Sequence, residues 1–321
     1  MSIFYKRTFV FSVFILSNVT AFAQKRDSIP EKAKAFIADK FPMARALNLE
    51  YHLVSPYRYT SNFMGAELPE GKVENLYQLK ASANINFITG KRWSLGTILG
   101  YRYISAKLEN TPGKKEFQYH SESLNLSHYS RLFGKTAVYT ASAVVDGTER
   151  HFERMRGVLT ATLVLKATRE TQMTLGLIGL IDPGALVPVF PSFSYKHNFS
   201  NGWVADVILP KGVLLRKNVL ENGRFSLGSE LENTFFYLYG LDDTGKTYSL
   251  NQMEINSGFT YEHYLGSSFV ATFKTGMKNV VNARIFEKSA AQNDYIFKAS
   301  PEPSLYFNVG LSFNPFGKKK K

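Results

Sequence analysis

Histidine and serine lie close together at two places in this 321-residue sequence, and such a pair could belong to a hydrolytic site. His128 precedes Ser130 by two positions, and the dipeptide Glu262-His263 lies near Ser267. A histidine that activates a serine needs a third group to orient its ring. Pairs at this spacing also arise by chance, so we assign no catalytic residue here and expect these side chains to be structural.

Motifs for other chemistry are missing from the sequence. It has no phosphate-binding glycine loop, no zinc-ligand spacing, no nucleophile elbow and no cysteine. We therefore expect no cofactor and no metal. The formal net charge is +13, but the basic residues are scattered and follow no aromatic-basic recognition pattern, so we expect no nucleic-acid partner. Anionic lipid or lipopolysaccharide phosphates are the partners that this charge favours.

Charged residues recur at alternate positions along several segments. Alternate residues of a strand lie on one face of a sheet, and opposite charges on neighbouring strands can pair there. Such rows either fill and stiffen the interior of a barrel or line a narrow polar path that selects a solute. The residues expected to line a lumen are Lys80, Arg102, Glu230, Glu232, Glu254, Glu262, Lys274 and Lys278.

The strands that would carry these rows are visible as alternation. In NLYQLKASANINF (75–87) the apolar positions alternate with polar ones almost without error, and similar runs follow from Leu47 to Phe313. Short connections such as TGKR (89–92) alternate along the chain with longer ones near 57–74, 106–118, 147–155, 240–247 and 282–301. Outer-membrane barrels have this asymmetry between short periplasmic turns and long extracellular loops. The apolar face of 75–87 is therefore predicted to meet lipid and the polar face to meet the lumen.

Aromatic residues mark the short turns. Amphipathic rings at the ends of strands, beside the turns, are typical of a membrane–water interface. The predicted interface residues are Trp93, Phe133, Phe199, Trp203, Tyr264, Phe269 and Phe313.

The strand number follows from parity. Plain alternating runs number thirteen, which would leave the two chain ends on opposite sides. Dividing the stretch from Trp203 to Arg224 at Pro210-Lys-Gly212 and at Glu221-Asn-Gly223 gives an even number. The prediction is thus an all-β fold, a transmembrane antiparallel up-and-down β-barrel of about 14 strands, with 12 as the alternative.

The first residues predict export. Lys6 and Arg7 precede the apolar run 8–19, and Ala21-Phe22-Ala23 has the small-x-small pattern of a cleavage site. We therefore expect a signal peptide over 1–23 and a place in the cell outer membrane of a Gram-negative bacterium. No later apolar run is long enough for a transmembrane helix.

The residues next to the signal peptide differ from the rest of the chain. Ser28-Ile-Pro-Glu31 has the pattern of a capping box and Pro42 ends the run, so a short helix is predicted over about 30–40. This segment, 24–45, lies in the periplasm, enters the barrel mouth, or is a frayed extension. The barrel domain is expected over 46–316, followed by a basic tail over 317–321.

Two stretches resemble known proteins. Leu305-Tyr-Phe-Asn-Val-Gly-Leu-Ser-Phe313 resembles the closing strand of outer-membrane proteins, which the barrel-assembly machinery reads, although this chain continues past Phe313. The stretch VFPSFSYKHNFSNGWVADVILPKGVLLRK (189–217) resembles an uncharacterised family of outer-membrane β-barrels from Bacteroidota-type bacteria. That resemblance implies the fold and the location, and no activity.

Three functions remain open at this point. The first is a channel or solute-transport barrel, partly closed by loops or by residues 24–45. The second is a closed structural or binding barrel that acts through its extracellular loops. The third is a lipid-modifying outer-membrane enzyme. The sequence names neither a solute nor an oligomeric state.

Overall fold

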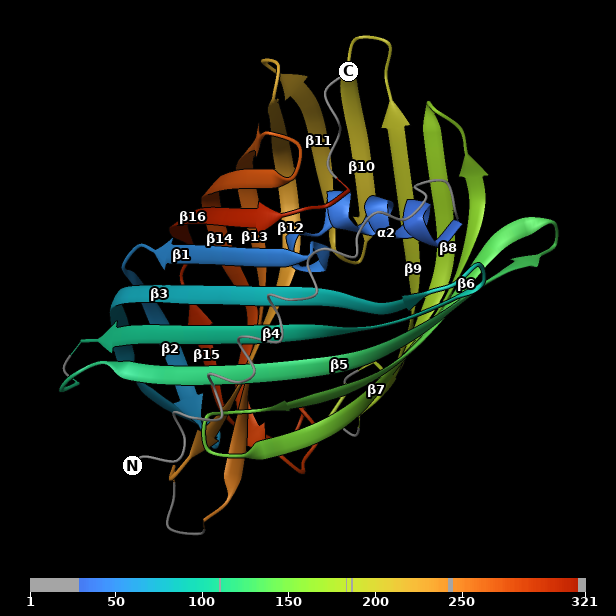
Figure 1. Cartoon of the computed structure of the whole chain (residues 1–321). Coiled ribbons are helices and arrows are strands. Elements are labelled where there is room, and N and C mark those ends of the chain that lie inside the picture. Colours follow the sequence, from blue (N-terminus) through green and yellow to red (C-terminus); the bar gives the residue numbers. More distant parts are fainter. Residues whose placement is uncertain (1–28, 110, 183, 186, 242–244, 317–321) are drawn as a thin grey trace, which may run out of the picture.

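The protein is a single β-barrel with a helix inside it (Figure 1). The computed structural model describes residues 29–109, 111–182, 184–185, 187–241 and 245–316. The predicted signal peptide, the residues 24–28 and the basic tail 317–321 lie outside this described part. Two helical elements come first, α2 (Ile29–Lys40) and the 3-10 turn η2 (Pro42–Ala44).

Strands make up the rest of the barrel. They are β1 (Leu47–Val54), β2 (Tyr57–Phe63), β3 (Ala66–Thr89), β4 (Trp93–Leu108), β5 (Lys115–Leu132), β6 (Lys135–Gly147), β7 (Phe152–Ala167), β8 (Thr171–Ile181), β9 (Val189–Asn198), β10 (Trp203–Leu209), β11 (Gly212–Val219), β12 (Gly223–Tyr239), β13 (Thr247–Leu265), β14 (Phe269–Glu287), β15 (Tyr295–Pro301) and β16 (Ser304–Phe313).

The barrel closes between its first and last strands. β1 pairs antiparallel with β16 on one edge and with β3 on the other, and β2 pairs with β15 and β3. Backbone hydrogen bonds from Ser55 N to Leu305 O (2.9 Å) and from Glu302 N to Arg58 O (2.8 Å) continue the pairing across both breaks. The sixteen segments therefore occupy fourteen positions in a closed antiparallel barrel, which confirms the predicted 14 strands and the division of 203–224.

The predicted long connections are mostly strand. β2 with the first part of β3, and β14 with β15, form paired ribbons where loops were expected at 57–74 and 282–301, so those two predictions were wrong. The reason is that alternation requires one face in water and one in an apolar medium. In the first part of β3, Glu67, Glu70 and Lys72 stand beside exposed apolar residues, and the pairing continues without a two-residue pattern.

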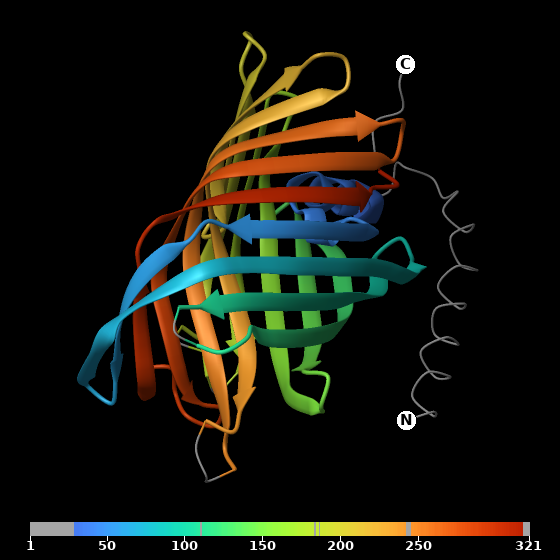
Figure 2. The same ribbon diagram turned by 90° about the vertical axis from the view of Figure 1, so that its left-hand side faces the viewer.

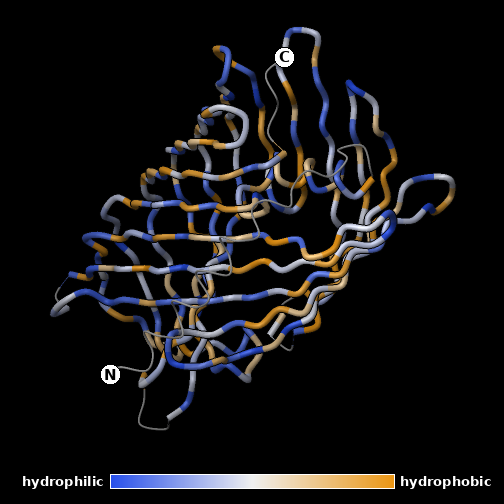
Figure 3. The backbone as a smooth tube through the Cα atoms, in the orientation of Figure 1, coloured by the Kyte–Doolittle hydropathy of each residue, from blue (hydrophilic) through white to orange (hydrophobic). Residues whose placement is uncertain are grey.

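The two faces of the wall differ as the alternation predicts. Along β1 the outward residues Leu47, Leu49, Tyr51 and Leu53 are exposed, while the inward Asn48, Glu50, His52 and Val54 are buried. Figure 3 shows hydrophilic and hydrophobic positions alternating along the strands. A closed backbone network with an apolar outer belt is the form in which strands can cross a bilayer, because no N–H or C=O group is left unpaired in lipid.

The helix α2 lies inside the wall of strands in both views of the barrel (Figures 1 and 2). It is at the end where the short turns lie, since Lys34 Nζ donates a hydrogen bond to Thr89 Oγ1 at 2.6 Å, beside the β3–β4 turn. The described part of the predicted segment, residues 29–45, thus enters the barrel mouth, and its helix matches the predicted range. Within the described ranges, no helix is both long and apolar enough to cross a membrane.

The interior differs between the two ends. Toward the long connections it contains an apolar cluster of Val54, Val73, Leu76, Ile104, Phe236 and Tyr306. Phe236 on β12 lies 6.0 Å from Phe117 and 6.2 Å from Tyr119 (ring centroids), and both are on β5. β5 and β12 are opposite one another in the ring of strands, so opposite walls pack directly together. The end with the short turns is instead filled by charged groups and α2.

Candidate functional site

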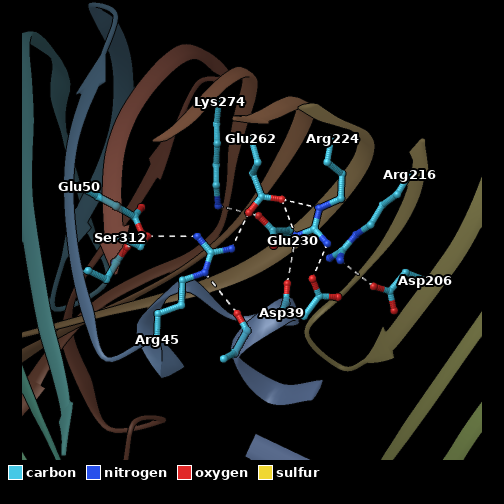
Figure 4. Close-up of polar contacts among 12 residues, drawn as sticks. Asp39, Arg45, Glu50, Asp206, Arg216, Arg224, Glu230, Glu262, Lys274 and Ser312 are labelled. Carbon is cyan, nitrogen blue, oxygen red and sulfur yellow. Dashed lines mark hydrogen bonds and ion pairs between the residues drawn. The ribbon is translucent and has the colours of Figure 1, made fainter. Parts of the chain in front are cut away.

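The charged interior at the short-turn end is centred on Arg224 of β12 (Figure 4). Its Nε and Nη2 atoms lie 2.7 Å and 2.6 Å from Glu262 Oε2 on β13. Its Nη1 donates to Asp39 Oδ1 of α2 at 2.5 Å, and its Nη2 donates to the Asp39 backbone oxygen at 3.1 Å. Arg224 therefore joins the wall of the barrel to the last turn of the helix.

Arg45 makes a second connection between the N-terminal segment, which we define as residues 29–45, and the wall. Its Nη2 lies 2.5 Å from Glu262 Oε1, its Nη1 donates to Ser312 Oγ at 3.1 Å, and its Nε donates to the Ala38 oxygen at 3.2 Å. Glu262 thus lies between two guanidinium groups, one from the wall and one from the N-terminal segment. Charge-assisted contacts of this kind are stronger than neutral hydrogen bonds.

Lys40 makes the third connection. It forms an ion pair with Asp206 of β10, whose other oxygen lies 3.0 Å from Arg216 Nη1 of β11. All three side chains are almost fully buried. Breaking one partner of such a buried pair leaves an uncompensated charge and typically costs about 3–5 kcal/mol. We call Lys196, Asp206, Arg216, Arg224 and Glu262 the Arg224 cluster.

The cluster controls the ionisation of the helix residue that it binds. Burial by itself raises the pKa of the Asp39 carboxyl, but the nearby Arg224, Lys196 and Arg216 cations outweigh it and hold that pKa well below its usual range. Burial lowers the pKa of the Lys40 ammonium, and Asp206 opposes this only in part. At neutral pH, Asp39 therefore binds the wall as a carboxylate.

Six of the predicted lumen residues pair with one another inside the barrel. Lys278 on β14 lies 2.6 Å from Glu254 on the neighbouring β13, as cross-strand pairing predicts. Lys274 instead passes β13 and lies 3.1 Å from Glu230 on β12. The pair formed by Lys80 and Glu232, at 2.6 Å, joins β3 to β12 across the interior.

The two other predicted lumen residues also bind across strands. Arg102 on β4 donates to Thr234 Oγ1 at 2.9 Å and to the Asn233 oxygen at 3.2 Å, both on β12. Glu262 belongs to the Arg224 cluster already described. The structure therefore places all eight predicted side chains in contacts that connect strands or the N-terminal segment.

A further polar group closes the end with the long connections. The buried Asp146 of β6 accepts hydrogen bonds from Tyr237 of β12, from Tyr119 of β5 at 3.1 Å and from Arg156 of β7. Tyr239 of β12 donates to Glu153 Oε1 of β7 at 2.6 Å. Together with the apolar cluster, these contacts hold β12 against β5, β6 and β7.

One of the predicted interface aromatics, Tyr264, differs from the other six. Trp93, Phe133, Phe199 and Phe269 are exposed on the barrel. Phe269 packs against Phe313 with ring centroids 5.2 Å apart, and the Lys217 ammonium lies 5.1 Å from the Trp203 ring.

Tyr264 is a correction to that set. It pairs with Val270, which is 1% exposed and faces the interior, so Tyr264 lies on the inner face. It shares the parity of Glu262, and proximity to a short turn misplaced it among the outward rings.

The histidines and serines singled out in the sequence contact other side chains. The His128 ring lies 4.0 Å from that of Trp93 on the neighbouring strand, and His263 Nδ1 lies 3.0 Å from Tyr261 Oη. Ser267 Oγ is 3.4 Å from Ser268 Oγ. Glu262, next to His263 in sequence, points to the opposite face and binds arginine. In the part of the chain that the structure describes, no group of three or more His, Cys, Asp or Glu side chains could hold a metal ion.

Sequence reasoning missed the residues that matter most at this site. Asp206 and Arg224 have the inward parity of their strands and could have been found by extending the same rule to β10 and β12. Asp39, Lys40 and Arg45 carried no such signal, because their partners lie far away in sequence and only the position of α2 brings them together.

Comparisons with known proteins return barrels of very low sequence identity. No protein-family model and no curated protein matches the chain. Among solved structures, it is similar to the COG4313 outer membrane channel from Pseudomonas putida F1, with 10% identity, a TM-score of 0.36, and 83% of this chain and 94% of that chain covered.

Two further solved structures are similar at the same level. A Pseudomonas aeruginosa FadL homologue has 10% identity, a TM-score of 0.28, and coverage of 85% and 92%. The transport unit of the autotransporter AIDA-I from Escherichia coli has 10% identity, a TM-score of 0.29, and coverage of 84% and 90%. Likeness at this level does not extend to solute or mechanism.

Proposed function

We propose that this protein is an outer-membrane solute-transport barrel in a closed state, with the N-terminal segment as a removable closure at its periplasmic end. The observation that supports this proposal is how α2 is held. Its contacts with the wall are mainly ionic, through Asp39, Lys40 and Arg45, and its apolar Ile29 and Ile37 are exposed. Ionic contacts can be exchanged for water and solute ions, whereas an apolar core cannot be opened at similar cost.

The proposal requires a second closure to open as well. β12 packs across the interior against β5 and β6 through Phe236 and Tyr237. Removal of the N-terminal segment alone would leave this closure in place. A conducting path therefore needs both ends released.

Planar-bilayer conductance tests this proposal with four proteins: the full chain, a deletion of residues 24–45, Phe236→Ala, and the combination of both changes. Each must first be shown to fold by its heat-modifiable migration in a gel. We expect the full chain to be silent and the combination to conduct steadily. If the protein with both changes folds but does not conduct, the channel proposal is contradicted.

A closed structural or binding barrel is the second candidate, and the packing of opposite walls favours it. The contacts between β12 and β5 bury aromatic rings in the lumen, and barrels of this kind are stiff. This function predicts silence of all four proteins.

The partners follow from the location that we propose. The outward apolar belt would contact lipid and lipopolysaccharide, and the terminal strand β16 would be read by the barrel-assembly machinery. We further propose membership of the Bacteroidota-type barrel family that the stretch 189–217 resembles. Loss of outer-membrane insertion on replacing Phe313 with a polar residue would support the role of β16, and normal insertion would contradict it.

A further inference from the structure

The carboxylate of Asp39 is bound by cations that belong to the barrel wall. Arg224 Nη1 lies 2.5 Å from Asp39 Oδ1, and Lys196 Nζ of β9 lies 3.8 Å from Oδ2. The Arg224 side chain is 10% exposed, whereas that of Asp39 is 34% exposed. The cations are thus set into the wall, and the carboxylate reaches them from α2 inside the barrel.

The wall holds Arg224 and Arg216 without help from Asp39. Glu262 fixes Arg224 through two atoms, and Asp206 lies against Arg216. Among the described residues, Asp39 is the one carboxylate within ion-pair distance of Lys196. Without Asp39 the Arg224 cluster therefore has three cations and two carboxylates, and it lacks one negative charge.

A small cavity adjoins two of these cations, Arg216 and Arg224. It has a volume of about 20 Å³, enough for one water molecule, and its charged lining also includes Asp39, Glu230, Glu262 and Lys274. Arg216 is 5% exposed, and its Nε atom has no hydrogen-bond partner. A buried guanidinium N–H is costly unless an acceptor reaches it. The cluster thus offers a donor that Asp39 does not use.

We infer that the Arg224 cluster is a binding site for small carboxylate-bearing solutes, and that Asp39 occupies it in the closed state as an intramolecular substitute. This inference rests on the proposed transport function and adds the class of solute. A carboxylate that enters the lumen competes with Asp39 for Arg224 and Lys196. Occupation of the site by solute removes the Asp39 contact of the last turn of α2 and so weakens the docking of the helix, which Lys40 and Arg45 also hold.

The competition gives the inference a distinctive test, since the apparent affinity for a solute falls with the fraction of sites that are already occupied. Asp39→Asn removes the competing negative charge without changing the wall. Binding of succinate to the purified full-length barrel, measured by calorimetry, is expected to be about tenfold tighter in this variant than in the unchanged protein. A residue with a purely structural role would not tighten binding when removed.

Two further variants locate the site. In the Asp39→Asn background, Lys196→Gln is expected to weaken succinate binding about tenfold, because one of the cations is lost. Arg58→Gln in the same background is the matched control. Arg58 pairs with Glu70 on the exposed β2–β3 ribbon, far from the cluster, and its loss is expected to leave binding unchanged.

Release of the helix is measured separately. The chain has no cysteine, so Ile37→Cys on the exposed side of α2 accepts a single spin label. Succinate is expected to increase the mobility of this label, and sodium chloride at matched ionic strength is not. Equal release by both salts would show that salt releases α2 by screening its ion pairs, and it would contradict a specific binding site. Release by inorganic phosphate but not by succinate would overturn the assignment to carboxylates.

The outcome is independent of whether the barrel conducts. Succinate binding that is tightened by Asp39→Asn in a protein without conductance would keep the site and refute the transport function. Conductance in the combined variant without succinate binding would keep the transport function and refute the site.

Discussion

The guanidinium of Arg224 lies between two carboxylates, with Nε 2.7 Å from Glu262 Oε2 on the wall and Nη1 2.5 Å from Asp39 Oδ1 on the helix. One side chain therefore connects the barrel to the segment that fills its short-turn end. It acts together with the Arg45–Glu262 and Lys40–Asp206 pairs, which make the other two connections.

Asp39→Asn is expected to loosen α2 while leaving the barrel folded. The amide keeps the shape but loses the charge attraction of Arg224 and Lys196. Because a third of the Asp39 side chain is exposed, we expect a loss of about 1–2 kcal/mol of docking free energy, below the range for a fully buried pair. The mobility of a spin label at position 37 measures this loss. Glu70→Gln, which removes an exposed pair with Arg58, is the control, and an equal effect of both changes would contradict the expectation.

Docking of α2 is expected to resist mild acid. The pKa of Asp39 in the docked state lies below that of a free aspartate, so its contribution is fully present above the ordinary value of about 4 and is lost as the pH falls through the lower docked value. The charged groups that face the carboxylate are Arg224, Lys196 and Arg216. Label mobility should therefore be constant between about pH 8 and about pH 5. Release within that window, absent from the Asp39→Asn variant, would show that the carboxylate titrates higher.

Phe236→Ala is expected to destabilise the barrel by about 3–5 kcal/mol, since it removes a fully buried ring from the contact between opposite walls. The midpoint of the heat-modifiable transition measures the loss. Phe259→Ala removes the same ring from the exposed outer face of β13 and serves as the control. If both variants unfold at the same temperature, Phe236 is not part of a packed core.

The two tryptophans are expected to lie near one membrane interface. Trp93 and Trp203 both begin strands beside short turns, and the ring of Trp93 is exposed on the outer face. In the variants Trp93→Phe and Trp203→Phe, the remaining tryptophan should be quenched most by lipids that carry bromine near the headgroup. Strongest quenching by bromine at the end of the acyl chains would place that tryptophan at the bilayer centre and contradict the interface.

Much of the wall was determined by the sequence alone. The two-residue alternation from Leu47 to Phe313 indicated which face of each strand is apolar, and parity required the division of 203–224 that the structure contains. These features are local, because a strand places successive side chains on opposite faces whatever its partners are. The same rule did not predict the ribbons that β2 and β15 form, because the first part of β3, which pairs with β2, is exposed on both faces and shows no alternation.

Only the tertiary structure decided how the interior is filled. Parity placed Glu232 and Lys80 on inner faces, but it could not predict that they pair across the lumen, because that depends on how far opposite walls approach. The position of α2 was equally undetermined, since Asp39 and Arg45 act only through partners on β12 and β13. Contacts between residues distant in the chain depend on closure of the whole barrel, and no short stretch of sequence records that geometry.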